Sequence, residues 1–340
     1  MMDKDRYNQL LENIGLTLSS RRQKASQAIN SELLLAKWEI GRDIIEYEQH
    51  GNEKAEYGSG LLNRLAKDLK QRYGTGFSRR SVSDMRRFYL VYPIWQTVSA
   101  KLTWSHYVEL LSIKDELERS FYEKQCLSEN WNVRDLKRQK NTSLFQRLAL
   151  SKDKAGVLKL TKQGQVFEKG EDVVKDPYVL EFLGIPEKHV YTEREFEQKI
   201  MDNLQSFILE LGKGFAFIGR QYRITLNNNH YYVDLVFYHR HLRCFVLIDL
   251  KTHKIDHADI GQMCMYLGYF KKEETMENEN PPIGIILAKE KDEILVEYAT
   301  EGISNNLFVS EYQLYLPDKK VLEQKLNVLL LETNDKDLEE

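Results

Sequence analysis

The feature that most constrains the fold of this chain is residues 215–270, where three β-type runs precede one helical run. The β-type runs cover Phe215–Leu226, Tyr231–Tyr238 and Arg243–Thr252. They are rich in Val, Ile, Phe and Tyr, and short polar turns separate them, which is the pattern of strands joined by hairpins. A chain with this segment is expected to fold around a β-sheet.

Two acidic residues interrupt the second and third of these runs. Asp234 lies within YYVDLVFY, and Asp249 lies within CFVLIDLK, with Lys251 two residues further on. Side chains two positions apart on a strand share a face, so Asp249 and Lys251 should point the same way. A carboxylate in an apolar strand is costly unless it is paired or binds a metal. These residues therefore require an explanation beyond packing.

The length of the turn between the two runs decides whether the acids meet. A two-residue turn at Arg240–His241, or a four-residue turn at residues 239–242, places Asp234 opposite Leu247. Asp249 is then its diagonal neighbour on the same face, at about 7–8 Å. An odd turn would put the acids on opposite faces. We expect an even turn and one acidic cluster.

The chemistry of such a cluster is phosphodiester hydrolysis. Two carboxylates at this spacing can share Mg²⁺ (or Mn²⁺), and the backbone carbonyl of Leu250 can complete the coordination. A bound metal lowers the pKa of a coordinated water. Lys251 would stabilise the negative charge that develops during attack. We therefore predict that Asp234 and Asp249 bind the metal and that Lys251 assists catalysis.

The order of these motifs resembles a known group of nucleases. The pattern D-x(14)-D-x-K, followed by a helix with QMxxYL, is similar to the PD-(D/E)XK nuclease superfamily and more closely to the YhcG-type bacterial family. The resemblance implies a restriction-endonuclease-like mixed sheet flanked by helices, after an all-α N-terminal domain. It is carried by FAFIGRQYRI, HYYVDLVFYHRHLRCFVLIDLK, GQMCMYL, DPYVLEFLG, WEIGRDI, GFSRRSVSDMRRFY and WSHYVELL.

Two positions depart from the pattern of the superfamily. Val233 stands where the superfamily name has Pro, which affects only the backbone. Asp249 stands where the close family usually has Glu, and it is one methylene shorter. A nuclease remains the preferred interpretation. The alternatives are a nucleic-acid-binding or complex-forming protein with a weak or inactive nuclease fold, and a toxin or defence effector controlled by a partner.

Glu197 and Gln262 are the two further site residues that we predict. Glu197 follows the capping box Thr192–Glu195 and lies on the apolar stripe of its helix. The resemblance implies that a first-helix acid assists the metal site, whereas the alternative is an acid at the rim. Gln262 belongs to the helix predicted over His257–Lys271 and is expected to orient water or a phosphate. Its alternative is a simple surface amide.

Three groups of residues are expected to contact nucleic acid. Tyr266 shares a helix face with Gln262, and Lys254 follows the catalytic lysine. In the first half of the chain, Ser78 is expected to cap a helix with four arginines and several aromatic residues, a combination that suits a phosphate backbone. The alternatives for this helix are a solvated face or arginines paired with acids of a partner subunit. The four arginines are Arg79, Arg80, Arg86 and Arg87.

Charge and periodicity divide the chain. Residues 1–150 carry 25 Lys and Arg against 19 Asp and Glu, whereas residues 151–340 carry 24 against 33. The basic first half is the half expected to face phosphates. Helical spacing of apolar residues predicts a helical domain over 1–145, of helix-turn-helix or winged-helix type. We expect a connector over 146–185, the α/β nuclease domain over 186–333 and an acidic tail over 334–340.

The remaining features bear on the cellular location, the substrate and the partners of the protein. No apolar run reaches the roughly 20 residues of a membrane span. The three cysteines form neither a metal-ligand spacing nor an even disulfide set, so a cytoplasmic protein is expected. The superfamily favours DNA as the substrate and an endonuclease over an exonuclease. A homodimer is expected because a double-strand cut needs two active sites, and restriction-modification or defence partners are a further expectation.

Overall fold

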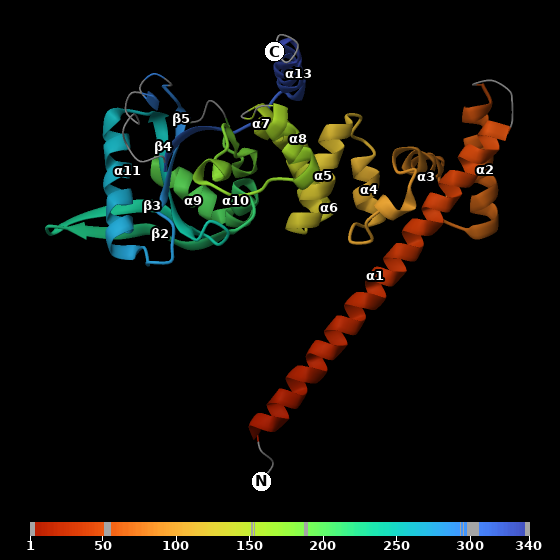
Figure 1. The fold of residues 1–340 in the computed structure, drawn as a ribbon, viewed down its shortest axis with the longest axis horizontal. Coiled ribbons are helices and arrows are strands. Elements are labelled where there is room, and N and C mark those ends of the chain that lie inside the picture. The colour runs from red at the N-terminus through yellow and green to blue at the C-terminus, as the bar shows by residue number, and fades with distance from the viewer. Residues whose placement is uncertain are drawn as a thin grey trace. The chain divides into compact units, whose positions relative to one another are not determined.

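The structure is a computed structural model that describes residues 4–50, 56–150, 152, 154–186, 190–292, 294, 296–297 and 306–336. The chain divides into two compact units (Figure 1). The first comprises residues 1–119 and 126–136, and the second comprises residues 120–125 and 137–340. Each unit is described by itself below.

The N-terminal part of the chain is helical, as its periodicity predicted. Its described residues contain helices and no strand, so the strands of a winged-helix module are not found there. Ser78 caps α3 by accepting a hydrogen bond from Ser81 N at 3.1 Å, as expected. The helices are α1 (Lys4–His50), α2 (Glu56–Tyr73), α3 (Arg79–Val91), η1 (Trp95–Thr97), α4 (Trp104–Leu110), α5 (Glu116–Glu129) and α6 (Val133–Asn141).

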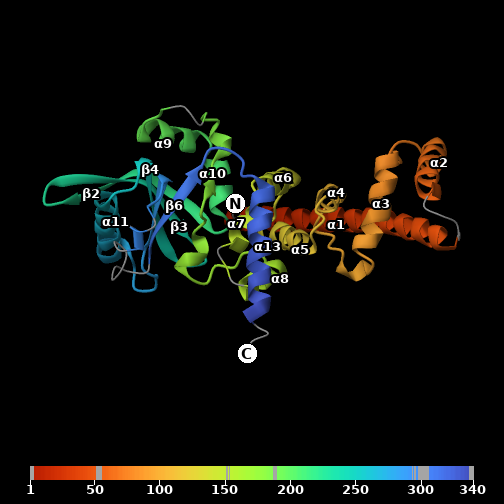
Figure 2. The same ribbon diagram turned by 90° about the horizontal axis from the view of Figure 1, so that it is seen from above.

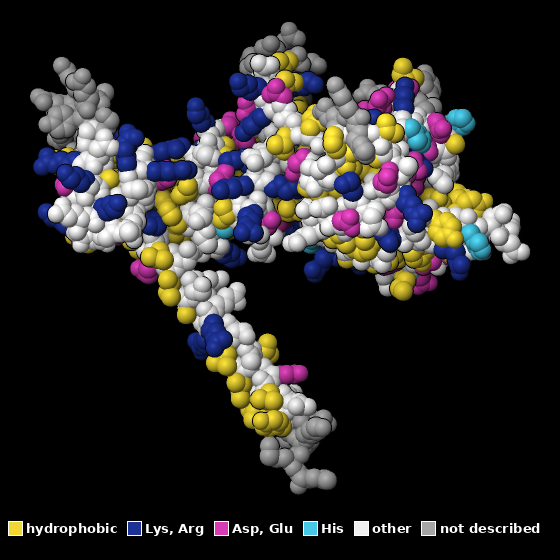
Figure 3. Space-filling model, turned by 180° about the vertical axis from the view of Figure 1, so that it is seen from behind, with side chains coloured by type: hydrophobic (Ala, Val, Ile, Leu, Met, Phe, Trp, Pro, Cys, Tyr) yellow, Lys and Arg dark blue, Asp and Glu magenta, His cyan; other side chains and the backbone are white. Residues whose placement is uncertain are grey.

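Helix α1 has two different halves. Its second half packs against α2 and α3 through a small core that contains Ile44, Ala66 and Val82. Its first half exposes apolar side chains, among them Leu11, Ile14 and Leu18. Figure 3 shows hydrophobic side chains, in yellow, along this helix. The first half of α1 therefore owes little of its stability to contacts within the described chain.

The second unit is built on a six-stranded mixed sheet in the order β1-β6-β5-β4-β3-β2. Strands β2, β3 and β4 form an antiparallel meander, and the β4–β5, β5–β6 and β6–β1 pairs are parallel. This arrangement confirms the predicted α/β class. The strands are β1 (Tyr178–Val179), β2 (Phe215–Leu226), β3 (Asn229–His239), β4 (Cys244–Lys254), β5 (Ile283–Glu290) and β6 (Leu307–Gln313).

Helices cover both faces of the sheet (Figure 1). Helices α9 (Glu193–Asp202) and α10 (Leu204–Leu211) bury apolar residues such as Phe196 and Phe207 against one face. Helix α11 (His257–Tyr269) buries Met263 and Leu267 against the other. The sequence predicted one helix where α9 and α10 stand, and the structure breaks it at Asn203.

The segment expected as a connector is part of the second unit. It contains α7 (Leu144–Leu150), α8 (Lys154–Gln163), η2 (Gly170–Val173), β1 and η3 (Glu181–Leu183). Strand β1 adds an edge to the sheet. Arg147 of α7 forms a buried ion pair with Glu210 of α10 at 2.7 Å. The polar, lysine-rich sequence that suggested a linker thus supplies buried ionic contacts to the fold.

The other described features of the second unit complete its outline. The chain continues from α11 through η4 (Phe270–Glu274) and closes with α13 (Lys319–Lys336). Five residues of the helix predicted over 290–300, which are 293, 295 and 298–300, and residues 337–340 of the predicted tail, lie outside the described residues. Among the helices described, none is long and apolar enough to cross a membrane.

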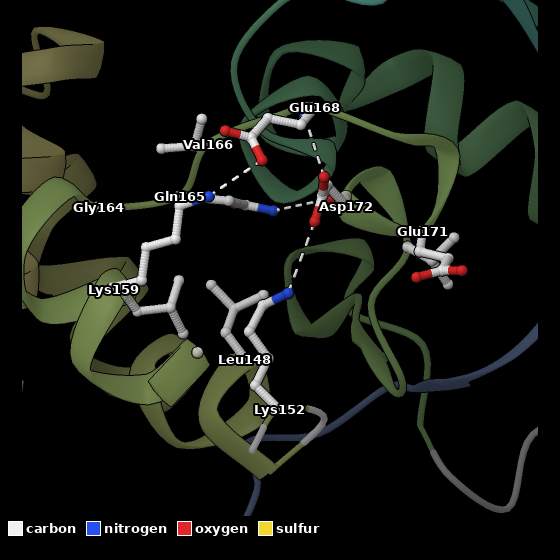
Figure 4. A pocket seen from close by; sticks show the side chains of 12 residues that line it. Leu148, Lys152, Lys159, Gly164, Gln165, Val166, Glu168, Glu171 and Asp172 are labelled. Carbon is white, nitrogen blue, oxygen red and sulfur yellow. Dashed lines mark hydrogen bonds and ion pairs between the residues drawn. The ribbon is translucent and has the colours of Figure 1, made fainter. Parts of the chain in front are cut away.

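A hollow of about 100 Å³ lies beside α7 and α8 (Figure 4). Lys152 extends into it toward Asp172, at 3.6 Å, and Lys159 pairs with Glu168 at 3.0 Å. Both lysines of its lining are therefore paired with acids, and none of the predicted site residues lines it.

Candidate active site

The hairpin of β3 and β4 brings the two acids closer than the sequence predicted. Val236, not Asp234, lies opposite Leu247, and His239 pairs with Cys244 across a four-residue turn. The turn is even, as expected, but it begins one residue later than the predicted four-residue turn. This changes the register by two residues. If the ladder continued beyond the Leu235–Ile248 pair, Asp234 would stand directly opposite Asp249.

The β3–β4 ladder ends where the acids begin. The last pair is Leu235 with Ile248, although both strands extend further. Beyond it, the backbone N–H of Leu250 donates to Oδ2 of Asp234 at 2.8 Å. The carboxylate of Asp234 thus accepts the hydrogen bond that a backbone carbonyl of β3 would accept in a regular ladder. The backbone carbonyl of Leu250 points to the same side of β4 as its N–H, toward this opening, because paired residues exchange both bonds.

Asp249 and Lys251 lie side by side in a buried position. Asp249 is 2 % exposed and Lys251 is 8 % exposed, and Lys251 Nζ lies 2.9 Å from Asp249 Oδ2. Despite this ion pair, Oδ2 of Asp249 has no partner with hydrogen-bond geometry among the described residues. This buried oxygen is therefore paired with the charge of Lys251 but accepts no well-oriented hydrogen bond among the described residues.

The protonation of the cluster reflects crowding of two acids. Burial, followed by the charge of Asp234, raises the pKa of Asp249 to about 7, and Lys251 only partly opposes the rise. Burial likewise raises the pKa of Asp234, against the hydrogen bond from Leu250. Burial disfavours the charge of Lys251, but the adjacent Asp249 outweighs it and raises the lysine pKa. Two interacting carboxylates that cannot both ionise easily without a cation are suited to binding one.

Helix α11 supplies the other partners of the lysine. Gln262 Oε1 accepts from Lys251 Nζ at 3.3 Å, so the predicted glutamine does lie beside the lysine. Asp259, which the sequence interpretation did not single out, lies 3.4 Å from the same ammonium through Oδ1. Its other oxygen accepts from the N–H of Asp256 at 3.0 Å in a capping box. The D-x-x-D spacing was the available signal for this residue.

Glu197 reaches the acids through a residue that sequence reasoning did not select. The side-chain nitrogen of Gln221 donates to Glu197 Oε2 at 2.7 Å and to Asp234 Oδ1 at 2.9 Å. Glu197 is buried on α9, as its place on the apolar stripe predicted. Gln221 therefore connects α9 to Asp234.

The backbone at Gln221 explains how this residue reaches the cluster. Its φ is +48°, in the left-handed region that side chains other than glycine seldom adopt. Leu235 belongs to the core beneath α9 and α10, whereas Val233, two residues away, belongs to the core beneath α11. A regular strand would keep both on one face. The hairpin therefore twists sharply where Gln221 faces Asp234, a feature without a local sequence signal.

The residues present fit a metal of the Mg²⁺ class. Asp234 and Asp249 offer carboxylate oxygens, one of them without a hydrogen-bond donor among the described residues. By strand geometry the carbonyl of Leu250 is expected on the same side as its N–H, which donates to Asp234. Among the described residues, no group of three or more His, Cys, Asp or Glu side chains is arranged to hold a metal. Mg²⁺ commonly uses one or two carboxylates with waters and substrate phosphates. Two acids with a carbonyl meet that requirement.

Two residues predicted to contact nucleic acid near the cluster have other partners. Tyr266 is fully buried and donates to the carbonyl of Tyr232 at 2.9 Å, which leaves its ring no exposed surface for a ligand. The i, i+4 spacing with Gln262 did not reveal that Tyr266 lies on the core side. Lys254 is exposed and pairs with Asp292 at 2.8 Å.

The four arginines of α3 do not form one free surface. Arg86 forms an ion pair with Glu48 of α1 at 2.8 Å, and Arg87 donates to the carbonyl of Leu111. Arg80 lies 3.9 Å from Asp84, and Arg79 is exposed. Partners elsewhere in the first unit therefore engage Arg86 and Arg87. The alternative interpretation for this helix expected acids of a partner subunit, whereas Glu48 belongs to the same chain and the partner of Arg87 is a backbone carbonyl.

Comparisons with known proteins assign both parts of the chain to known domain families. Residues 171–327 match the YhcG PDDEXK nuclease domain, and residues 13–147 match the DUF1016 N-terminal domain. A protein of Escherichia coli strain K12 named "Putative nuclease YhcG" is 40 % identical over 352 aligned residues, which cover 94 % of this chain and 93 % of that protein.

Solved structures show weaker likenesses. A repair endonuclease from Pyrococcus abyssi is 22 % identical over 39 % of this chain and 50 % of its own, with a TM-score of 0.27. EndoMS in a complex with double-stranded DNA is 16 % identical over 40 % of this chain and 50 % of its own, with a TM-score of 0.26. This chain thus spans half the length of each.

The mixed sheet, the two acids and the adjacent lysine place the second unit in the class of PD-(D/E)XK nuclease domains. The chain belongs to the YhcG family, with a helical DUF1016 N-terminal domain before the nuclease domain.

Proposed function

We propose that this protein is a metal-dependent nuclease that hydrolyses phosphodiester bonds in DNA, as an endonuclease. The observation that carries the proposal is the opening between β3 and β4. There the buried carboxylate of Asp249 and the partly buried carboxylate of Asp234 interact so that both ionise only at a cost, next to a buried lysine. Such a cluster is destabilising by itself and becomes favourable when a divalent cation occupies it.

Asp234, Asp249 and the carbonyl of Leu250 would hold Mg²⁺ or Mn²⁺. When bound, the ion supplies an activated water and neutralises phosphate charge. Lys251 keeps its proton because Asp249 lies beside it, so its ammonium can stabilise negative charge that develops on the phosphate. Gln262 fixes the position of that ammonium.

Glu197 and Gln221 support the acids from the other side. The amide of Gln221 donates to both carboxylates, which sets the distance between Glu197 and Asp234. Asp249 is shorter than the usual glutamate, but in this register its carboxylate interacts directly with that of Asp234. The shorter side chain therefore does not argue against activity.

A titration of Mg²⁺ and Mn²⁺ with supercoiled, linear and single-stranded DNA tests the proposal. We expect Asp234→Ala and Lys251→Ala each to lower the cleavage rate by about 10³-fold or more, because each removes several kcal/mol of transition-state stabilisation. Glu277→Ala, which removes an exposed acid of the loop before β5, is the matched control and should cut like the wild type.

The form of DNA that the protein cleaves distinguishes an endonuclease from an exonuclease. Conversion of supercoiled DNA to open or linear forms supports an endonuclease, whereas cleavage restricted to linear DNA indicates an exonuclease. Wild-type rates in both variants, or no cleavage by the wild type with either metal, would refute the proposal.

A further inference from the structure

The hairpin of β2 and β3 extends past the acid cluster as a two-stranded arm. Its register pairs Tyr222 with Val233, Arg223 with Tyr232 and Thr225 with His230, and it turns at Asn227–Asn228. Figures 1 and 2 show the paired strands extending beyond the rest of the sheet. About six residues separate the acids from the turn, which is roughly 20 Å of strand.

The two faces of the arm differ. Tyr222 and Tyr231 pack against the core beneath α11, and Ile224 and Val233 belong to that core. Because side chains alternate along a strand, the residues between them lie on the opposite face. These are Arg223, Thr225, His230 and Tyr232, and all four are exposed. Folding of the second unit therefore accounts for one face of the arm and leaves the other without a packing role among the described residues.

The chemistry of the exposed face suits a polyanion. Residues 215–233 contain no Asp or Glu, although the chain from residue 151 onward carries an excess of acids. The face presents a guanidinium, a hydroxyl, an imidazole and a phenol. The turn adds the amides of Asn227, Asn228 and Asn229, which can donate to and accept from base edges.

The exposed face begins close to the acid cluster along the strands. Arg223 stands two residues from Gln221, and Tyr232 stands two residues from Asp234, so the face begins about 7 Å along the strands from the cluster. A substrate whose phosphodiester lies at the acids would have its neighbouring nucleotides against the arm.

Pairing with another strand is a poor explanation for the arm. Strand β2 is the edge of the sheet, and an edge can pair with a further strand. A register shift between Phe217 and Gly219 and the left-handed φ of Gln221 interrupt this edge. Such irregularities protect an edge from pairing.

We propose that the β2–β3 arm binds double-stranded DNA, with Arg223 and Tyr232 against the backbone of the cut strand and the Asn227–Asn229 turn in the major groove. A two-stranded ribbon is an element that the major groove admits. This proposal rests on the proposed function for the choice of ligand.

The test is duplex binding measured by fluorescence anisotropy with EDTA present and the probe verified as intact. The full-length double variant Arg223→Ala/Tyr232→Ala should bind a labelled duplex about tenfold more weakly than the wild type, and its affinity should depend less steeply on salt. Arg240→Ala removes an exposed arginine at the opposite end of β3 and should change the dissociation constant less than about twofold. Thermal unfolding of each variant verifies its fold.

Two outcomes would overturn the proposal. Wild-type duplex affinity in the double variant would remove the arm from the interface, and an equal loss on single-stranded DNA would contradict the choice of a duplex. Because binding is measured without turnover, these outcomes do not depend on whether the protein cuts. Conversely, wild-type cleavage by Asp234→Ala would refute the proposed catalytic site and leave the arm result standing.

Discussion

The acids of β3 and β4 and the arginines of α3 look alike in the sequence, since each is a group of like charges in a short segment. In the structure they differ. Arg86 has Glu48 as its partner and Arg87 has a carbonyl, whereas Asp249 has Lys251 on one side and a second acid on the other. Charges with opposite partners alone hold a fold together, whereas a buried acid that faces a second acid as well as a cation is a candidate for a ligand site.

A second buried acid shows that burial alone does not create a site. Glu210 is fully buried, and burial by itself would raise its pKa. Three cations, Arg147, Lys175 and Arg138, instead lower its pKa to about 2. Asp249 has one cation and an acid neighbour, and its pKa is about 7. The number of opposite charges around each carboxylate, rather than its depth, separates the structural acid from the catalytic candidate.

The largest expected effect is on stability as a function of pH. The folded-state pKa of Asp249, about 7, lies above its ordinary value of 3.8, so between these values the folded protein binds more protons than the unfolded chain. Stability without metal should therefore fall as pH rises from about 4 to about 7, by at most about 4 kcal/mol at about 1.4 kcal/mol per pKa unit.

Differential scanning calorimetry in EDTA at pH 5 and pH 8 measures this effect. We expect Asp249→Asn to reduce the difference in melting temperature between the two pH values, and Mg²⁺ to stabilise the wild type at pH 8 but not this variant. An equal pH dependence in both proteins would show that the acid cluster is not under electrostatic stress.

A smaller effect is expected from Gln221, the bridge between Glu197 and Asp234. Gln221→Gly removes the amide and tolerates the backbone φ of +48°. Loss of such a supporting hydrogen bond typically lowers metal affinity about 10-fold or more. The Mg²⁺ concentration for half-maximal cleavage should rise accordingly, with the rate largely recovered at saturating metal.

Gln221→Asn is the control for that measurement. Asparagine tolerates the same backbone conformation and keeps a shorter amide, so its metal requirement should lie between those of the wild type and Gln221→Gly. If both variants need no more metal than the wild type, Gln221 only shapes the hairpin.

The smallest effect is expected in the first unit. Arg86→Ala and Glu48→Ala should each destabilise it by about 0.5–1 kcal/mol, and the double variant by little more than either, because one partly exposed ion pair is lost in every case. Arg79→Ala removes an exposed side chain and should change stability by less than about 0.5 kcal/mol.

Tryptophan fluorescence during denaturant unfolding reports on the first unit, since all four tryptophans lie in it. Duplex binding by the same variants sharpens the comparison. If Arg79→Ala alone weakened duplex binding, the part of α3 around Arg79 would belong to a nucleic-acid interface. Additive losses of stability in Arg86→Ala and Glu48→Ala would contradict the ion pair.

The features that the sequence determined depend on interactions between residues close together in the chain. The strands 215–254, the caps at Ser78, Thr192 and Asp256, and the placement of Asp249 beside Lys251 follow from alternation and capping within a few residues. These features depend on hydrogen bonds and periodicities that the neighbouring residues specify.

Contacts between distant residues account for what only the tertiary structure decided. The two-residue change of register, the Gln221 bridge, the burial of Tyr266 and the Glu48 partner of Arg86 all join segments far apart in the chain. Spacing within one segment carries no information about such partners. The sequence therefore determined which acids belong together, and the packed sheet decided how closely they meet and which other side chains hold them.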